Sequence, residues 1–228
     1  MISENEVLKL SSPFRCNFKN KTCGLRLLED VKDESIKICF FDPQYRGVLD
    51  KLKYGNEGKG REKMRCSLQQ MSEDIIVKFI VAIERALKPS GYLFLWVDNF
   101  HLCEWKGKWL AETDFHVVDL ITWDKEKMGM GYRTRKRSEH LIVIQKKPIK
   151  AKGTWNLHNI PDVWSEKILN KNHPHAKPEG LQVALISATT NEGDYVLDPA
   201  AGGYSVLRSC VLTKRNFIGG DIEFGDIN

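Results

Sequence analysis

The residues with the clearest chemical potential stand at the end of a predicted strand. The apolar run 36–41 predicts a buried strand that ends at Pro43. Asp42, Pro43, Gln44 and Tyr45 then supply a carboxylate, backbone carbonyls and an aromatic ring. An exocyclic amine has two N–H donors, which a carboxylate and a carbonyl can accept while the aromatic ring stacks on the base. The motif therefore favours a flipped nucleobase as ligand; the alternative is a turn in which Asp42 caps the backbone locally.

A second group of candidate residues follows a later predicted strand and is rich in glycine. Gly202 and Gly203 would let the backbone approach a ligand closely, although a structural strand-to-helix turn also needs glycine. Asp221 follows the next predicted strand, near the roughly 20-residue offset at which an acidic side chain meets ribose hydroxyls in dinucleotide folds. Together these features predict a cofactor that contains adenosine.

The charge of this glycine-rich turn distinguishes among such cofactors. The turn lacks the Gly-x-Gly-x-x-Gly pattern, and Asp198 lies where a pyrophosphate would have to approach, which disfavours NAD. The Asp198 carboxylate would instead attract a cation, such as the sulfonium or ammonium group of S-adenosylmethionine.

Three motifs together resemble those of a known enzyme family. The tetrad 42–45 is similar to the Asp-Pro-Pro-Tyr motif of DNA amino-methyltransferases, and 197–203 is similar to their cofactor motif, Asp-Pro-Phe-x-Gly-x-Gly. The segment 173–178 resembles the His-Pro-Thr-Gln-Lys-Pro segment that precedes that motif. Their order is that of the β class, known from bacteria and phages, and the resemblance covers nearly the whole chain. It implies a permuted Rossmann-like α/β methyltransferase fold, S-adenosylmethionine as cofactor and no metal.

The resemblance also assigns roles to individual residues. It implies that Asp42 and Pro43 hold the target amine and that Tyr45 stacks on the base, with Gln44 completing the catalytic tetrad. The residues that it implies for cofactor binding are Phe41, Asp42, Lys177, Asp198, Pro199, Ala200, Ala201, Gly202 and, at the ribose, Asp221.

Several positions depart from the family pattern. Gln44 replaces the second proline of the tetrad, and Ala200 replaces a phenylalanine beside the cofactor. Cys23 stands where relatives tend to carry an aspartate near the cofactor adenine, and Tyr204 shifts the usual glycine spacing. We therefore expect the chemistry to be retained, with a modest affinity for the cofactor.

The predicted elements that position these motifs alternate between strands and helices. This alternation implies a mainly parallel sheet with helices on both faces. Ser72 predicts the start of a helix that ends at 89–91, and Pro178 predicts the start of another. Further strands are predicted at 92–97, 117–123, 141–145, 194–197 and 216–218, and further helices at 100–112 and 206–211. The strands 117–123 and 141–145 are expected to form an antiparallel hairpin at the sheet edge.

Two segments beside the predicted site are candidates for contact with nucleic acid. The segment 46–70 has many charges and few apolar positions, which predicts a mobile loop that faces DNA. The segment 148–172 shows no clean period and is predicted to be a small insertion for target recognition. The basic residues that could contact phosphates, the alternative being a solvated face, are Lys51, Lys53, Lys59, Arg61, Lys63, Arg65, Arg133, Arg135, Lys136 and Arg137.

Composition bounds the remaining possibilities. The 228 residues fit a single methyltransferase domain, 1–228, because one core stops growing near about 250–300 residues. The formal charge of +5 permits a polyanionic partner without proving one. No apolar run approaches the roughly 20 residues of a membrane helix, and no signal segment opens the chain, so a cytoplasmic protein associated with the nucleoid through DNA is expected. The six cysteines lack zinc-site spacing and are predicted to be free thiols.

These observations predict an enzyme that methylates the N6 amine of a flipped adenine in duplex DNA. Asp42 favours adenine, because serine is common at that position in the N4-cytosine enzymes of the family. The sequence leaves open an N4-cytosine product, an RNA or protein amino-methyltransferase, and a DNA-binding protein with a decayed active site. It is also compatible with a homodimer and with a cognate restriction enzyme as partners.

Overall fold

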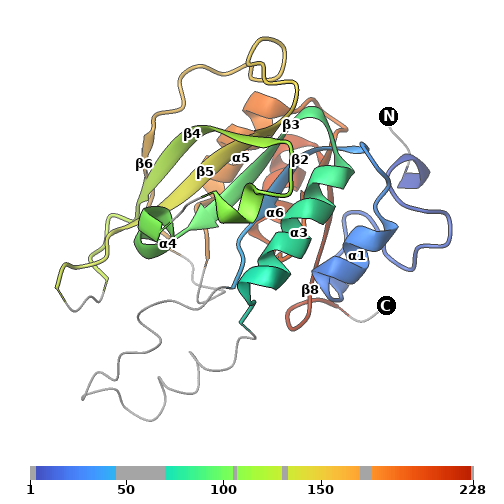
Figure 1. Ribbon diagram of the computed structural model, residues 1–228, viewed down its shortest axis with the longest axis horizontal. Coiled ribbons are helices and arrows are strands. Elements are labelled where there is room, and N and C mark those ends of the chain that lie inside the picture. The colour runs from blue at the N-terminus through green and yellow to red at the C-terminus, as the bar shows by residue number, and fades with distance from the viewer. Residues whose placement is uncertain (1–3, 45–69, 105–106, 130–132, 170–175, 227–228) are drawn as a thin grey trace.

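A computed structural model describes residues 4–44, 70–104, 107–129, 133–169 and 176–226. The centre of the described structure is an eight-stranded sheet with the strand order β1-β8-β7-β2-β3-β5-β4-β6 (Figure 1). In that order the strands are β1 (Asn20–Lys21), β8 (Asn216–Asp221), β7 (Tyr195–Asp198), β2 (Ile36–Phe41), β3 (Leu87–Val97), β5 (Ser138–Lys146), β4 (Phe115–Asp124) and β6 (Val163–Ser165).

The sheet is mainly parallel, which confirms the predicted fold class. β1, β8, β7, β2 and β3 run in the same direction, whereas β5 is antiparallel to both of its neighbours, β3 and β4. The predicted hairpin of β4 and β5 is present, but it does not form the edge of the sheet. β6 pairs in parallel with the end of β4, so the segment 148–172, predicted to be irregular, contributes a short strand beyond the hairpin.

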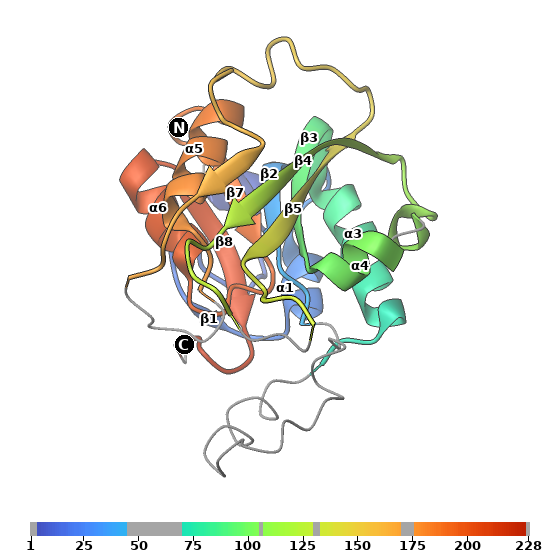
Figure 2. The same ribbon diagram turned by 90° about the vertical axis from the view of Figure 1, so that its left-hand side faces the viewer.

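Helices cover both faces of this sheet, in a three-layer arrangement that Figure 2 shows most clearly. One layer holds α1 (Gly24–Asp30), α3 (Glu73–Ala86) and α4 (Asn99–Glu104), and the other holds α5 (Glu179–Thr189) and α6 (Ser205–Thr213). Short 3-10 helices lie at Glu4–Glu6 and Lys108–Leu110. Among the described residues, no helix combines the length and apolar character needed to cross a membrane.

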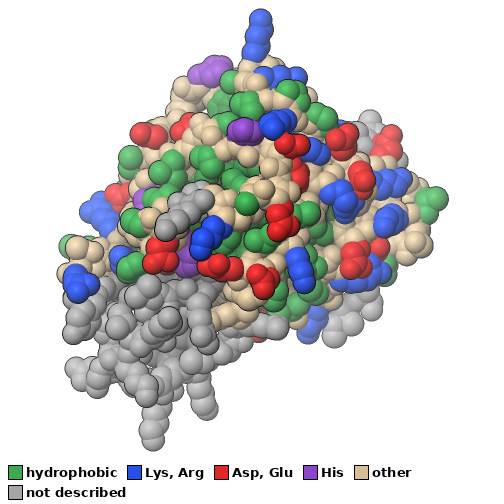
Figure 3. Space-filling view, in the orientation of Figure 1, with side chains coloured by type: hydrophobic (Ala, Val, Ile, Leu, Met, Phe, Trp, Pro, Cys, Tyr) green, Lys and Arg blue, Asp and Glu red, His purple; other side chains and the backbone are tan. Residues whose placement is uncertain are grey.

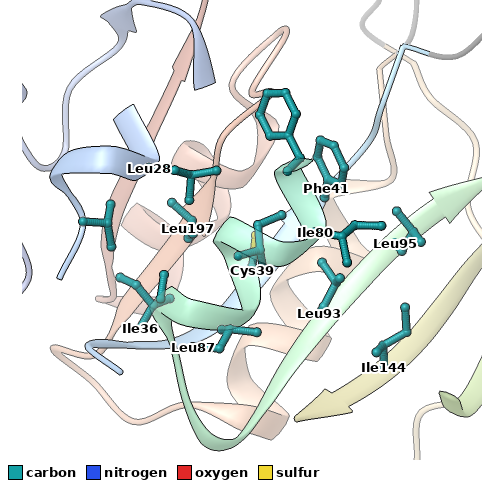
Figure 4. Packing of buried hydrophobic residues seen from close by; sticks show 14 of the residues in the cluster. Leu28, Ile36, Cys39, Phe41, Ile80, Leu87, Leu93, Leu95, Ile144 and Leu197 are labelled. Atoms are coloured by element: carbon teal, nitrogen blue, oxygen red, sulfur yellow. The ribbon is translucent and has the colours of Figure 1, made fainter. Parts of the chain in front are cut away.

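Two hydrophobic cores lie between these layers because successive strand residues point to opposite faces of a sheet. In β2, Cys39 and Phe41 pack on the side of α1 and α3, whereas Ile38 and Phe40 pack on the side of α5 and α6. Figure 4 shows the first of these cores. Cys39 and Cys210 are fully buried, one in each core, and the described cysteines are free thiols, as predicted.

At the boundary between α3 and β3, strand pairing determines the structure where the local sequence pattern predicts a turn. Ser72 caps α3 as predicted, since its Oγ accepts the N–H of Ile75 at 3.4 Å. β3 then begins directly at Leu87, where we predicted a turn before a strand starting at 92. Leu87 pairs with Ile36 of β2, so the strand contains the Pro-Ser-Gly turn signal at 89–91.

Two other elements also differ from their predictions. The helix expected at 100–112 is divided into α4 and the 3-10 helix 108–110, which follows Gly107 in a left-handed conformation (φ 69°). β8 continues past 218 to Asp221, so Asp221 is the last residue of the strand rather than a residue after it.

The segment 148–172 is tied to the core through Glu166. The helix α5 begins after Pro178, which offers no side-chain acceptor for the first N–H groups of the helix. Glu166 replaces that cap, because its carboxylate accepts the N–H groups of Gly180 at 3.0 Å and Leu181 at 3.1 Å. It also accepts the indole N–H of Trp164 at 2.8 Å, so one side chain fixes both the segment and the start of α5. Trp164 packs against the core.

We therefore expect Glu166→Ala to lower the free energy of unfolding by about 1.5–3 kcal/mol, the usual contribution of hydrogen bonds to a charged group. Urea denaturation followed by tryptophan fluorescence would measure this loss. Glu166→Gln keeps one acceptor oxygen and should cost less. An alanine variant as stable as the wild type would contradict the capping role.

Candidate active site

The site is built where β2 and β7 lie side by side at the centre of the sheet. Cys39 of β2 is paired in parallel with Leu197 of β7, so the residues that follow both strands meet at one edge of the sheet. Asp42 follows β2, and Asp198 ends β7. Ligands of parallel α/β sheets bind at this carboxyl edge, where neighbouring strands diverge.

Two cavities open at this edge, one on each side of the glycine-rich turn. The larger, of about 420 Å³, is lined by residues that include Asp42, Trp96, Lys177, Asp198 and Gly202. It lies toward α5, α6 and the residues after β6.

The smaller cavity, of about 290 Å³, lies toward α1 and α3. Cys23, Pro199, Asp221 and Ile222 contribute to its wall. Asp42, Ala200 and Gly202 line both cavities, so a single elongated ligand could occupy the two together with Asp42 beside its middle.

Most of the residues predicted for cofactor binding are brought together here. Eight of them line at least one of the two cavities: Asp42, Lys177, Asp198, Pro199, Ala200, Ala201, Gly202 and Asp221. Phe41 does not: its side chain is fully buried and its ring stacks on Phe79, with 5.0 Å between the ring centroids. Phe41 therefore supports the site from the core rather than forming its wall.

Asp198 is the most deeply buried of these carboxylates, with 5 % of the residue exposed. Burial raises the pKa of Asp198 to about 8, and the nearby carboxylates of Asp42 and Asp221 act in the same direction. The backbone N–H of Ala200, which donates to Asp198 Oδ1 at 3.3 Å, offsets only part of this shift. A cation bound here would stabilise the ionised form.

The glycine-rich turn contains an unusual tyrosine. Tyr204 has φ of 55°, a left-handed conformation that normally favours glycine. Its buried hydroxyl donates to the carbonyl of Asn20 at 3.0 Å, and its ring meets that of Phe217 edge to face. These contacts hold the conformation without glycine, which accounts for the shifted glycine spacing in the sequence. They also join the turn to the β1–α1 corner beside the smaller cavity.

Asp42 is held in an ion pair that sequence reasoning only half anticipated. Lys177 Nζ lies 3.0 Å from Asp42 Oδ2 and 2.9 Å from Glu139 Oε2. Glu139 also accepts from Lys125 Nζ at 2.5 Å. Lys177 was predicted from its motif, whereas Glu139 and Lys125 carry no sequence signal, because their proximity depends on how β4 and β5 join the sheet.

The described backbone of the tetrad 42–45 offers fewer free carbonyl acceptors than its sequence suggests. The carbonyl of Gln44 already accepts the N–H of Met71 at 2.7 Å. Among the carbonyls at this turn, that of Pro43 is therefore the better candidate for a substrate amine. Two parts of the predicted site lie outside the described residues. One is Tyr45, and the other is the set of predicted phosphate contacts Lys51, Lys53, Lys59, Arg61, Lys63 and Arg65.

The second basic cluster lies in the β4–β5 loop at the same edge of the sheet, because β4 ends and β5 begins there (Figure 1). Arg133 and Arg135 are exposed. Arg137 instead forms a two-point ion pair with Asp124, at 2.6 and 2.8 Å, and Lys136 lies 4.6 Å from the ring centroid of Phe100. These two residues make contacts within the protein. Figure 3, in the orientation of Figure 1, shows acidic and basic side chains interspersed over the visible face.

Comparisons with known proteins agree with this geometry. Residues 36–226 match the N6_N4_Mtase family, described as DNA methylase. The type II methyltransferase M.HhaII of Haemophilus parahaemolyticus is 62 % identical over 211 residues, which is 92 % of each chain. The chain therefore belongs to the DNA methylase family.

Two solved structures share the fold at low sequence identity. The M1.HpyAVI–SAM complex matches with a TM-score of 0.63 and 20 % identity, over 90 % of this chain and 93 % of that one. The PvuII DNA methyltransferase, described as cytosine-N4-specific, matches with a TM-score of 0.70 and 15 % identity, over 92 % of this chain and 86 % of that one. They support the fold class that the motif resemblance and the alternation of strands and helices predicted.

Gly24 provides a test of how tightly this site is packed. It begins α1, and a Cβ added there would overlap the carbonyl oxygen of Pro199 and lie 2.7 Å from Cε1 of Phe79. Gly→Ala in a helix usually stabilises by up to about 1 kcal/mol. Here we expect Gly24→Ala to destabilise by about 1–3 kcal/mol, because the turn or the helix must shift. Urea denaturation gives the sign, and a stabilised variant would contradict the packing.

Proposed function

We propose that this chain transfers the methyl group of S-adenosylmethionine to the N6 amine of a flipped adenine in duplex DNA. The observation that carries the proposal is the position of Asp42, on the wall shared by the two cavities and beside Asp198 at the carboxyl edge. Membership of the DNA methylase family and the 62 % identity to a type II methyltransferase support the reaction class and a DNA substrate.

The donor set of the site suits S-adenosylmethionine. The adenosine part would occupy the smaller cavity, where Asp221 can accept from ribose hydroxyls and the side chain of Ile222 offers an apolar surface. The cationic methionine part would reach into the larger cavity beside Asp198. Cys23, rather than a carboxylate, lines this cavity, so the adenine amine would lack one charged acceptor there.

The chain's own residues would activate the target amine by hydrogen bonding. The amine nitrogen is a weak nucleophile because its lone pair is delocalised into the ring. Asp42 and the carbonyl of Pro43 would each accept one N–H, which favours a tetrahedral nitrogen with its lone pair directed away from the ring. S-adenosylmethionine supplies an electrophilic methyl group, and holding the amine against it provides much of the acceleration.

An aspartate at position 42 favours adenine as the target. A charge-assisted acceptor pulls more strongly on the amine than a hydroxyl does, and serine is common at this position in the N4-cytosine enzymes that the sequence resembles.

The exposed Arg133 and Arg135, at the same edge of the sheet, would contact phosphates of the duplex. We further propose that the enzyme acts in the bacterial cytoplasm, as a homodimer, beside a cognate restriction enzyme.

The product identifies the reaction most directly. Unmethylated genomic DNA incubated with the protein and S-adenosylmethionine should yield N6-methyladenine on mass spectrometry of its nucleosides. Asp42→Ala should abolish the product and leave the Kd for S-adenosylmethionine within a few fold, because Asp42 contacts the amine. N4-methylcytosine as the sole product would contradict the adenine assignment, and methylation of RNA but not DNA would contradict the substrate class.

Cofactor binding should release a proton from Asp198. With its pKa at about 8, this carboxyl is mostly protonated at pH 7, whereas a bound cation favours the carboxylate. The affinity for S-adenosylmethionine should therefore rise between pH 6 and 8 and level off above that. Calorimetry in buffers of different ionisation enthalpy would count the protons released. Asp198→Asn should bind more weakly and lose this release, and an equal proton release from that variant would argue against the assignment.

A further inference from the structure

Four charged side chains from four segments meet beside the larger cavity. Lys177 precedes α5, Asp42 follows β2, Glu139 lies in β5, and Lys125 follows β4. Lys177 bridges the two carboxylates, at 3.0 Å from Asp42 and 2.9 Å from Glu139. Lys125 contacts the other Glu139 oxygen at 2.5 Å. Each carboxylate is thus paired, and the group as a whole is neutral.

The sheet order explains why one lysine can reach both acids. β3 lies between β2 and β5, so Asp42 and Glu139 stand on either side of it. The Lys177 ammonium crosses this strand at 4.9 Å from the ring centroid of Trp96, which lines the same cavity. An ammonium over an aromatic face is stabilised there. Its place is therefore set by three contacts rather than by one ion pair.

Glu139 and Lys177 both remain charged at neutral pH. Burial would raise the pKa of Glu139, but the ammonium groups of Lys177 and Lys125 outweigh it and lower the pKa to about 2. Burial would likewise lower the pKa of Lys177, but the Asp42 and Glu139 carboxylates outweigh it and raise that pKa above its usual value. Only 12 % of the Lys177 side chain is exposed, so solvent screens these contacts little.

We propose that Glu139 is a positioning residue for the catalytic carboxylate, because it shares the Lys177 ammonium and thereby leaves one Asp42 oxygen for the substrate amine. This inference rests on the proposed role of Asp42. The ammonium contacts Oδ2 of Asp42, and Oδ1 is the oxygen that would accept from the amine. Without the Glu139 charge, Asp42 would be the remaining anionic partner of Lys177. The ammonium would then move to contact both Oδ1 and Oδ2 of Asp42.

A purely structural ion pair explains the arrangement less well. Glu139 already has Lys125 as a partner, so Lys177 is not needed to neutralise it. Burying an additional ammonium costs desolvation free energy that a simple pair often fails to recover. The bridge places this ammonium against the residue on which the proposed chemistry depends.

The test begins with Glu139→Gln, which removes the charge and keeps the shape. We expect kcat for tritium transfer from S-adenosylmethionine to unmethylated genomic DNA to fall at least about tenfold, with the Kd for S-adenosylmethionine changed less than about twofold. Glu34→Gln is the matched control. Glu34 Oε1 lies 3.3 Å from Nζ of Lys146, which is at the opposite end of β5 from Glu139. A kcat for Glu139→Gln equal to that of the control would overturn the proposal.

A double-mutant cycle asks whether Glu139 acts through Lys177. In a Lys177→Met background, Glu139→Gln should lower kcat by less than about twofold more, because the ammonium it positions is gone. The same tenfold loss in both backgrounds would overturn the proposal. Melting temperatures of all variants identify any loss that comes from unfolding.

A crystal structure of Glu139→Gln gives a readout independent of activity. We expect Lys177 Nζ to leave residue 139 and contact both oxygens of Asp42. Lys177 remaining between residue 139 and Oδ2 alone would overturn the positioning role. A wild-type protein that transfers no methyl group to DNA would instead contradict the proposed function, so the two failures are distinguishable.

Discussion

The parallel pairing of β2 with β7 is the interaction on which the rest of the site depends. It is made by two buried strands of the central sheet, with Ile38 opposite Val196 and Cys39 opposite Leu197. Because both strands end at the same edge, the residues after each of them meet, although more than 150 residues separate them in the sequence. The two cavities, the glycine-rich turn and the ion pair of Asp42 are all arranged around this junction.

The carboxyl groups on the two sides of this junction, Asp198 and Asp42, lie in different electrostatic environments. Burial raises the pKa of Asp198, the carboxylates of Asp42 and Asp221 act in the same direction, and no cation among the described residues offsets them. Asp42 has Lys177, whose ammonium it shares with Glu139. One carboxyl group is thus suited to receive an external cation, and the other already has its own. This asymmetry agrees with a cationic cofactor at Asp198 and a neutral amine at Asp42.

Local sequence patterns predicted the parts of this arrangement that are local in structure. The apolar run 36–41 is β2, Ser72 caps α3, and Pro178 precedes α5, because each depends on neighbours in sequence. Most of the residues that the motifs predicted for cofactor binding line one of the two cavities. Glu139 could not be predicted, since its role arises from the place of β5 beside β3, and neither could the left-handed Tyr204, which depends on a hydrogen bond to Asn20. Long-range contacts of this kind leave no periodic signal.

The most direct test of the account is a crystal structure of the protein with S-adenosylhomocysteine, the demethylated cofactor product. The account predicts its adenosine in the cavity beside Asp221 and Ile222, its amino acid part in the cavity beside Asp198, and its sulfur near Asp42, where the two cavities meet. A ligand confined to one cavity, with its sulfur remote from Asp42, would contradict the claim that the junction of β2 and β7 forms the centre of methyl transfer.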